Sequence, residues 1–347
     1  MKRLAWLVAA LVLAISGFGY GRDQPAVGAR PAPAAKDGGW TDISAKVLDA
    51  LAAAGKKPAW PGKTAGIAVD RNNGHVFMVV PDQGMWQSTD HGASFTRVDG
   101  GAVGGRCETG FALNFDPAGK RLACFMLDGQ SGYTLDGGRS WQKMTGNGRG
   151  WDAASVDWSA QQPTHVFALR HESGGEIFTS ADLGKSWKLA GKGFAAVGIF
   201  GLKTFVATKE HQQGILRSTD GGQSWQRVSE LQPAGRDIRM LDGVAYWTSA
   251  QGLLVSRDAG RTWARQGTAV ECSFGPYFGK DARHVVVVGK RGALETKDGG
   301  GSWELVAGLP PRMDAGLPGW FLNFGWDPIA NIFYASRMGE PAYKYQR

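Results

Sequence analysis

The sequence predicts an all-β chain that folds as a seven-bladed β-propeller, and two observations support this prediction. A short turn pattern recurs six times, with successive starts 46, 46, 38, 38 and 40 residues apart, and one propeller blade, a four-stranded sheet, has about that length. The composition agrees, because 52 glycines and 14 tryptophans in 347 residues indicate many turns and many large packing side chains.

The chain is expected to begin with a signal peptide over residues 1–21. Lys2 and Arg3 precede an apolar run over residues 4–15, which is shorter than the ~20 residues that span a bilayer. Residues 22–37, rich in Pro, Ala and Gly, are expected to be a flexible linker, and residues 38–347 the propeller. These features predict an exported protein, periplasmic or secreted, which contacts a membrane only if the signal segment stays uncleaved.

A short helix over 46–54 and the first strands, 66–70 and 75–80, follow the linker. The six turns then have the form Ser/Thr-X-Asp-X-Gly-X-Ser/Thr-Trp/Phe. They span 88–95, 134–141, 180–187, 218–225, 256–263 and 296–303. In such a turn Asp accepts hydrogen bonds from backbone amides two residues on, Gly supplies a positive φ, and the closing aromatic residue begins the next strand.

The seventh blade is predicted to be shared between the two ends of the chain. Three strands are expected over 321–326, 331–335 and 341–345, and no turn of the repeated form follows them. Residues 38–43 look like the end of such a turn and its following strand. They therefore complete the last blade and leave no free sheet edge.

The repeated turn resembles the Asp-box (BNR) repeat of sialidases, some xyloglucan-cleaving hydrolases, sortilin-type receptors and the photosystem II assembly factor family. The resemblance implies that the box aspartates are structural and that ligands meet the opposite face. That face is lined by the loops leading into each innermost strand and by those joining the second and third strands. The sialidase Arg motif ahead of the first box is not found, which argues against a neuraminidase.

Two groups of residues are predicted to lie on that face. The candidate catalytic residues are His171, Glu172, Glu210 and His211, because two imidazoles and two carboxylates from adjacent blades suit acid–base chemistry on a glycoside or uronate. The candidate ligand-binding residues favour carboxylates or sulfates through arginine forks. They are Arg106, Glu108, Arg149, Asp152, Arg170, Arg236, Arg239 and Arg337.

The leading hypothesis is a propeller that binds or cleaves an acidic glycan, as a glycoside hydrolase or polysaccharide lyase if it is an enzyme. The net charge of +8, which falls to +6 once Lys2 and Arg3 are removed, suits an acidic partner. The alternative is a non-catalytic protein-binding scaffold resembling the photosystem II assembly factors. No cofactor, metal or nucleic acid is expected, and the protein is expected to be a monomer.

Overall fold

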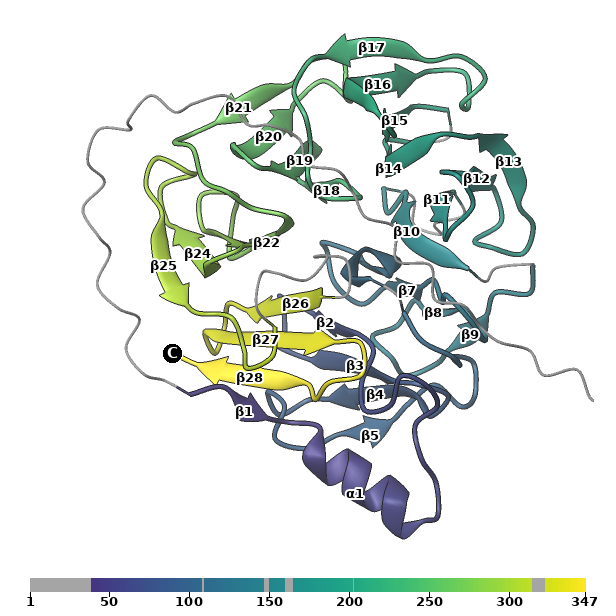
Figure 1. Ribbon diagram of the computed structural model, residues 1–347, viewed down its shortest axis with the longest axis vertical. Helices are drawn as coiled ribbons and strands as arrows, with labels where there is room; N and C mark the ends of the chain where they lie inside the picture. Colours follow the sequence, from purple (N-terminus) through teal and green to yellow (C-terminus); the bar gives the residue numbers. More distant parts are fainter. Residues whose placement is uncertain (1–38, 108, 147–149, 160–164, 202, 314–321) are drawn as a thin grey trace, which may run out of the picture. The chain divides into compact units, whose positions relative to one another are not determined.

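The computed structural model describes residues 39–107, 109–146, 150–159, 165–201, 203–313 and 322–347. The described residues belong to one compact unit of seven four-stranded antiparallel sheets arranged in a ring (Figure 1). The predicted seven-bladed propeller is therefore confirmed. The predicted signal peptide and linker lie outside the described residues. Where the chain is described, it contains no helix long and apolar enough to cross a membrane.

Six blades follow one another along the chain, each with its first strand nearest the centre of the ring (Figure 1). Their strands are β2 (Ile67–Val69), β3 (Val76–Val80), β4 (Gly84–Ser88) and β5 (Thr96–Arg97); β6 (Leu113–Phe115), β7 (Leu122–Cys124), β8 (Gly132–Thr134) and β9 (Gln142–Lys143); β10 (Trp151–Val156), β11 (Val166–Arg170), β12 (Ile177–Ser180) and β13 (Lys188–Gly191); β14 (Phe194–Ile199), β15 (Phe205–Lys209), β16 (Gln212–Ser218) and β17 (Gln226–Ser229); β18 (Arg239–Leu241), β19 (Val244–Ser249), β20 (Gly252–Ser256) and β21 (Ala264–Gln266); and β22 (Phe274–Phe278), β23 (Val285–Gly289), β24 (Gly292–Thr296) and β25 (Glu304–Ala307). A 3₁₀ turn, η1 (Gly110–Ala112), precedes β6.

The ring closes as predicted, in a blade built from both ends of the described chain. Its strands are β26 (Leu322–Asp327), β27 (Ile332–Arg337), β28 (Tyr343–Gln346) and β1 (Thr41–Asp42). Thr41 pairs with Lys344, and Asp42 pairs with Tyr343. The Trp40 ring lies 5.5 Å from the Tyr345 ring, and its indole N–H donates to the Gly308 carbonyl of the neighbouring blade.

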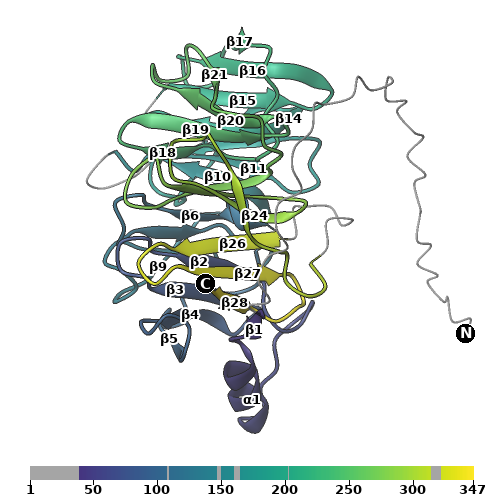
Figure 2. The same cartoon turned by 90° about the vertical axis from the view of Figure 1, so that its left-hand side faces the viewer.

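The predicted helix is α1 (Ala45–Ala53), at the outer edge of the ring beside β1 (Figure 2). Asp42 fixes its start, because Asp42 Oδ1 accepts hydrogen bonds from the backbone N–H groups of Ser44 and Ala45. Val47 and Leu51 recur at the spacing of one helical turn and are buried, so one face of the helix packs on the core between the first and last blades.

The six boxes share one hydrogen-bond pattern. In the fifth box, the Ser256 hydroxyl donates to Asp258 and accepts from Gly260 N–H, and Asp258 accepts from the N–H and hydroxyl of Thr262. The hydrogen bond from the Thr262 hydroxyl lowers the pKa of Asp258 to about 2, although burial opposes the shift. The aspartate thus reaches four residues on, not the two predicted, because the residue before the glycine, Ala259 here, also has positive φ.

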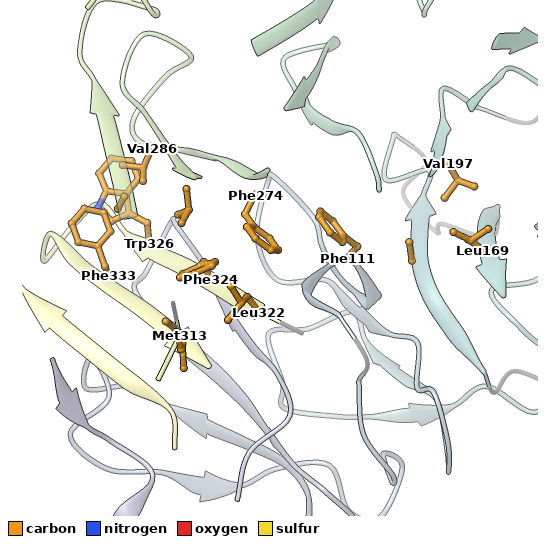
Figure 3. Close-up of a cluster of buried hydrophobic side chains, with 14 of the residues drawn as sticks. Phe111, Leu169, Val197, Phe274, Val286, Met313, Leu322, Phe324, Trp326 and Phe333 are labelled. Carbon is orange, nitrogen blue, oxygen red and sulfur yellow. The ribbon is translucent and has the colours of Figure 1, made fainter. Parts of the chain in front are cut away.

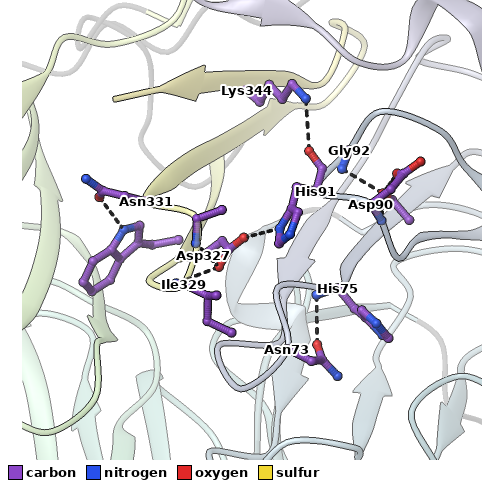
Figure 4. A network of polar contacts seen from close by, with 12 residues as sticks. Asn73, His75, Asp90, His91, Gly92, Asp327, Ile329, Asn331 and Lys344 are labelled. Carbon is purple, nitrogen blue, oxygen red and sulfur yellow. Dashed lines mark hydrogen bonds and ion pairs between the residues drawn. The ribbon is translucent and has the colours of Figure 1, made fainter.

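Side chains join the first box to the last blade and so reinforce the closure (Figure 4). His91 Nδ1 lies 2.6 Å from the fully buried Asp327 Oδ2, and Lys344 Nζ donates to the His91 carbonyl. Asp327 Oδ1 accepts from the backbone N–H groups of Ile329 and Ala330. Both oxygens of this buried carboxylate are therefore engaged, as a buried charge requires.

Aromatic side chains fill the centre of the ring (Figure 3). Phe111, beside the second blade, stacks on Phe274 of the sixth blade with ring centroids 5.6 Å apart. Phe274 also contacts Phe324 of the last blade at 5.3 Å. Because the second and sixth blades are not neighbours in the ring, this aromatic plug lies across the central axis.

Antiparallel pairing gives the ring two different faces. Loops leading into first strands and loops joining second to third strands share one face, here termed the loop face. Turns joining first to second strands share the other, here termed the box face, with the boxes, which join third to fourth strands. All the predicted site residues that are described belong to loops or strand ends of the loop face, and Arg239 is the first residue of β18.

Candidate functional site

The candidate site gathers on the loop face around Asp152. The register between β10 and β11 shifts between Trp151 and Ala153, which makes Asp152 the additional residue of a β-bulge, a feature that re-aims a side chain. His171 Nδ1 lies 2.7 Å from Asp152 Oδ1, and Arg236 Nη1 donates to Asp152 Oδ2 at 2.6 Å. Three predicted residues from two blades are thus joined in one chain, the Arg236–Asp152–His171 chain.

Backbone hydrogen bonds hold both ends of this chain. His171 N–H donates to the Gly150 carbonyl at 2.6 Å, where the loop leaves β11. The segment that carries Arg236 runs beside the neighbouring blade, because Val197 N–H donates to the Arg236 carbonyl. Arg236 therefore reaches Asp152 across the blade that lies between them.

The Arg236–Asp152–His171 chain determines which nitrogen of the His171 imidazole carries the proton. An ionised carboxylate only accepts hydrogen bonds, so His171 Nδ1 carries the proton and Nε2 is left to face solvent. The His171 side chain is 26% exposed and Asp152 13%, so a ligand can reach the imidazole while the carboxylate stays mostly covered. His171 Nε2 lies 3.6 Å from Glu172 Oε1. The arrangement can accept or donate a proton, or bind a hydroxyl or carboxylate group of a ligand.

The other two candidate catalytic residues belong to a different kind of loop. Glu210 and His211 are the two residues of the tight turn between β15 and β16, which Lys209 and Gln212 close, and both are exposed. Within the described ranges, no hydrogen bond or ion pair connects them to His171 or Glu172. The structure brings together His171, Glu172, Asp152 and Arg236, and leaves Glu210 and His211 apart from them.

The predicted arginine ring is largely paired with carboxylates. Glu108 and Arg149 lie outside the described residues. The partners of the other arginines are Asp128 for Arg106, Glu176 at 3.8 Å for Arg170, Asp152 for Arg236, Asp237 at 3.6 Å for Arg239, and the Arg312 carbonyl oxygen for Arg337. Four of these arginines therefore have a carboxylate beside them, which offsets much of the positive charge that they bring to this face.

A solvent-exposed tryptophan on the loop face was missed. Trp60, 68% exposed, lies in the segment leading into β2, and the guanidinium of Arg106 stacks 4.4 Å from its ring centre. A flat ring exposed on this face can pack against the apolar side of a ligand. The signal was available in the sequence, because Trp60 belongs neither to a box nor to a predicted strand.

Asp237 is buried beside Arg239 without a hydrogen bond. It is 2% exposed, and neither of its carboxylate oxygens has a hydrogen-bond partner among the described residues. Burial raises the pKa of Asp237 to about 6, although the charge of Arg239 opposes the shift. The folded protein therefore holds the proton of Asp237 more tightly than the unfolded chain, whose aspartate pKa is near 3.8.

Replacing Asp237 with asparagine is expected to change how stability depends on pH. Because the pKa of Asp237 is higher in the folded protein, its contribution to stability falls as pH rises from about 4 to 7. The two pKa values differ by about two pH units, so the variant should gain up to about 3 kcal/mol relative to wild type over that range. Urea unfolding at both pH values tests this, with Asp242→Asn, an exposed aspartate of the same blade, as control. A stability difference that does not change with pH would contradict it.

The described residues contain no group of three or more His, Cys, Asp or Glu side chains placed to hold a metal ion. The groups that the site itself offers to a ligand are the imidazole of His171, the carboxylates of Asp152 and Glu172, and the guanidinium of Arg236.

Comparison with known proteins identifies the repeat. The family model for the BNR/Asp-box repeat matches residues 216–227, which contain the fourth box. No curated protein matches the chain. Similar solved structures include YCF48 bound to a D1 peptide, with 15% identity and a TM-score of 0.47 over 91% of this chain and 99% of that one.

Two further structures are similar at comparable levels. YCF48 from Cyanidioschyzon merolae shows 14% identity and a TM-score of 0.45, over 84% of this chain and 98% of that one. An ancestral GH74 enzyme shows 17% identity and a TM-score of 0.45, over 81% of this chain and 44% of that one. The chain is a seven-bladed propeller with Asp-box repeats.

Proposed function

We propose that this chain is an exported propeller that binds an acidic glycan on its loop face, with His171 in position for acid–base chemistry on that ligand. The observation that carries the proposal is the Arg236–Asp152–His171 chain, with contacts of 2.6 and 2.7 Å. The Arg236–Asp152–His171 chain fixes an imidazole at a partly exposed position. The strands of a blade pair without such side-chain contacts, so a role in ligand binding accounts for them.

The chemistry of a glycan matches the groups on this face. Sugar hydroxyls both donate and accept, so they can bond to His171 Nε2, and a uronate carboxylate can accept a hydrogen bond from the guanidinium of Arg236. Trp60 offers a flat apolar ring on the same face for the apolar side of a sugar. The net charge, +8 for the full chain and +6 once Lys2 and Arg3 are removed, favours an acidic over a neutral glycan at long range.

The proposed export is supported by the leader. Lys2, Arg3 and the apolar run behind them form a secretory pattern. A glycan ligand and an extracytoplasmic location are consistent with one another.

The test is incubation of the protein with a panel of acidic and neutral polysaccharides, in which thermal shift, new reducing ends and unsaturated-uronate absorbance are followed together. We expect stabilisation by acidic members and its loss in His171→Ala. His211→Ala, a loop-face histidine at a tight turn of the next blade, is the matched control and should bind like wild type. Product formation that requires His171 would establish an enzyme, and stabilisation without product a binding module. Silence across the panel would overturn the proposal in favour of a protein-binding scaffold.

A further inference from the structure

Two adjoining cavities open on the box face, away from the proposed glycan site. The inner cavity has a volume of about 110 Å³ and the outer about 440 Å³. Both cavities are larger than the volume that a single water molecule occupies. Residues from the first, second, third and fifth blades line both, namely Arg71, Asp116, Pro117, Val156, Trp158 and Met240.

The walls are mostly apolar and aromatic. Phe115, Phe278 and Trp326 line the inner cavity, and Phe200 and Leu241 line the outer. Phe324 of the aromatic plug also lines the inner cavity, whereas Trp60, Asp152, His171, Glu172 and Arg236 line neither cavity. A ligand here enters from the box face and meets none of the residues of the proposed glycan site.

Arg71 supplies a positive charge inside these walls. It is half-buried, its Nε donates to the Pro117 carbonyl at 3.1 Å, and its Nη1 donates to the Gly279 carbonyl. Among the described residues no carboxylate forms an ion pair with Arg71. Arg239 also lines the inner cavity, with Asp237 3.6 Å from its Nε. The buried carboxylate of Asp116, on the same lining, is paired with Arg121. A guanidinium whose described hydrogen bonds all go to neutral carbonyls favours an anionic partner.

We propose that the box-face cavity binds a small organic monocarboxylate with an aromatic or aliphatic body. The carboxylate pairs with Arg71, on the side of the cavity that Arg239 also lines, and the body packs on the aromatic walls. Burial of the body supplies the affinity, and the fork of Arg71 supplies the orientation.

Charge at the outer cavity restricts this ligand further. Asp157 and Asp242 line the outer cavity, so a second negative charge on the ligand meets repulsion there. A polyanionic glycan is therefore excluded, and the inference stands or falls independently of the proposed function.

The test is calorimetric titration of the full chain with phenylacetate, indole-3-acetate and octanoate, each beside its neutral carboxamide. We expect saturable one-to-one binding of at least one carboxylate, and binding of its amide weaker by about tenfold or more. Arg71→Gln should lose about the same factor. Arg257→Gln removes an exposed arginine of the fifth box that donates to the Gln266 side chain. Neither residue lines a cavity, so this variant should bind like wild type.

Equal affinity of wild type for acid and amide, or the absence of saturable binding by any of the three acids, would overturn the inference. The acid–amide comparison uses wild type alone, so it decides the question even if Arg71→Gln does not fold. Unchanged carboxylate binding by a folded Arg71→Gln variant would overturn it as well.

Discussion

Asp152→Ala is expected to reduce acidic-glycan affinity more than any other single change on the loop face. The substitution removes the common partner of His171 and Arg236, so the imidazole loses its fixed orientation and the guanidinium is left without this carboxylate. Breaking a hydrogen-bonded charge pair costs several kcal/mol when fully buried. The Arg236–Asp152–His171 chain is partly exposed, so we expect the binding free energy to weaken by about 2 kcal/mol. The dissociation constant, measured by calorimetric titration, should rise about thirtyfold.

The matched control is Asp157→Ala. Asp157 directly follows the same strand, β10, but belongs to the box face, where its carboxylate accepts from Ser159. Suppose that Asp157→Ala loses as much glycan affinity as Asp152→Ala. Glycan binding would then depend on negative charge anywhere on this blade, and the Arg236–Asp152–His171 chain would not form the site.

Removal of the closing strand is expected to have the largest effect on stability. A protein that begins at residue 45 lacks Trp40, the pairing of β1 with β28, and the buried Ile43. Loss of buried aromatic and aliphatic contacts of this size costs about 3–5 kcal/mol, and β28 gains an unpaired edge that promotes association. Urea unfolding and light scattering should show a lower midpoint and new aggregation.

The reference for this deletion is a protein that begins at residue 39, which keeps β1 whole. Equal unfolding midpoints for the two proteins would mean that the last blade is stable with three strands and that β1 does not close the ring.

The fold could be predicted because its signal is local and repeated. Each box carries all the residues that its turn needs, so six boxes place six blades without knowledge of long-range contacts. The split blade could be predicted for the same reason, since three strands without a box at one end match a box remnant at the other. Errors were confined to strand ends and to the reach of the box aspartate, which depends on positive φ at a residue such as Ala259.

The site was only partly predictable, because strand register places loops and does not give the reach of side chains. His171 and His211 occupy equivalent loops, so the sequence alone does not distinguish them. The loop of His171 is long enough to fold onto Asp152, whereas His211 lies in a two-residue turn. The pairing of Arg236 with Asp152 depends on a bulge at Asp152 and on a segment that crosses a whole blade. The role of Arg71 at the cavity could not be predicted, because no local sequence feature indicates that it donates to carbonyls of two other blades.

The most direct test of a glycan site on the loop face is a heteronuclear NMR titration of the protein with an acidic oligosaccharide that stabilises it. We expect the largest shifts at the His171 imidazole and at the backbone amides of residues 150–152, with the indole of Trp158 on the box face unchanged. Shifts confined to the box face, or no shift at His171 under saturating ligand, would contradict the proposed site.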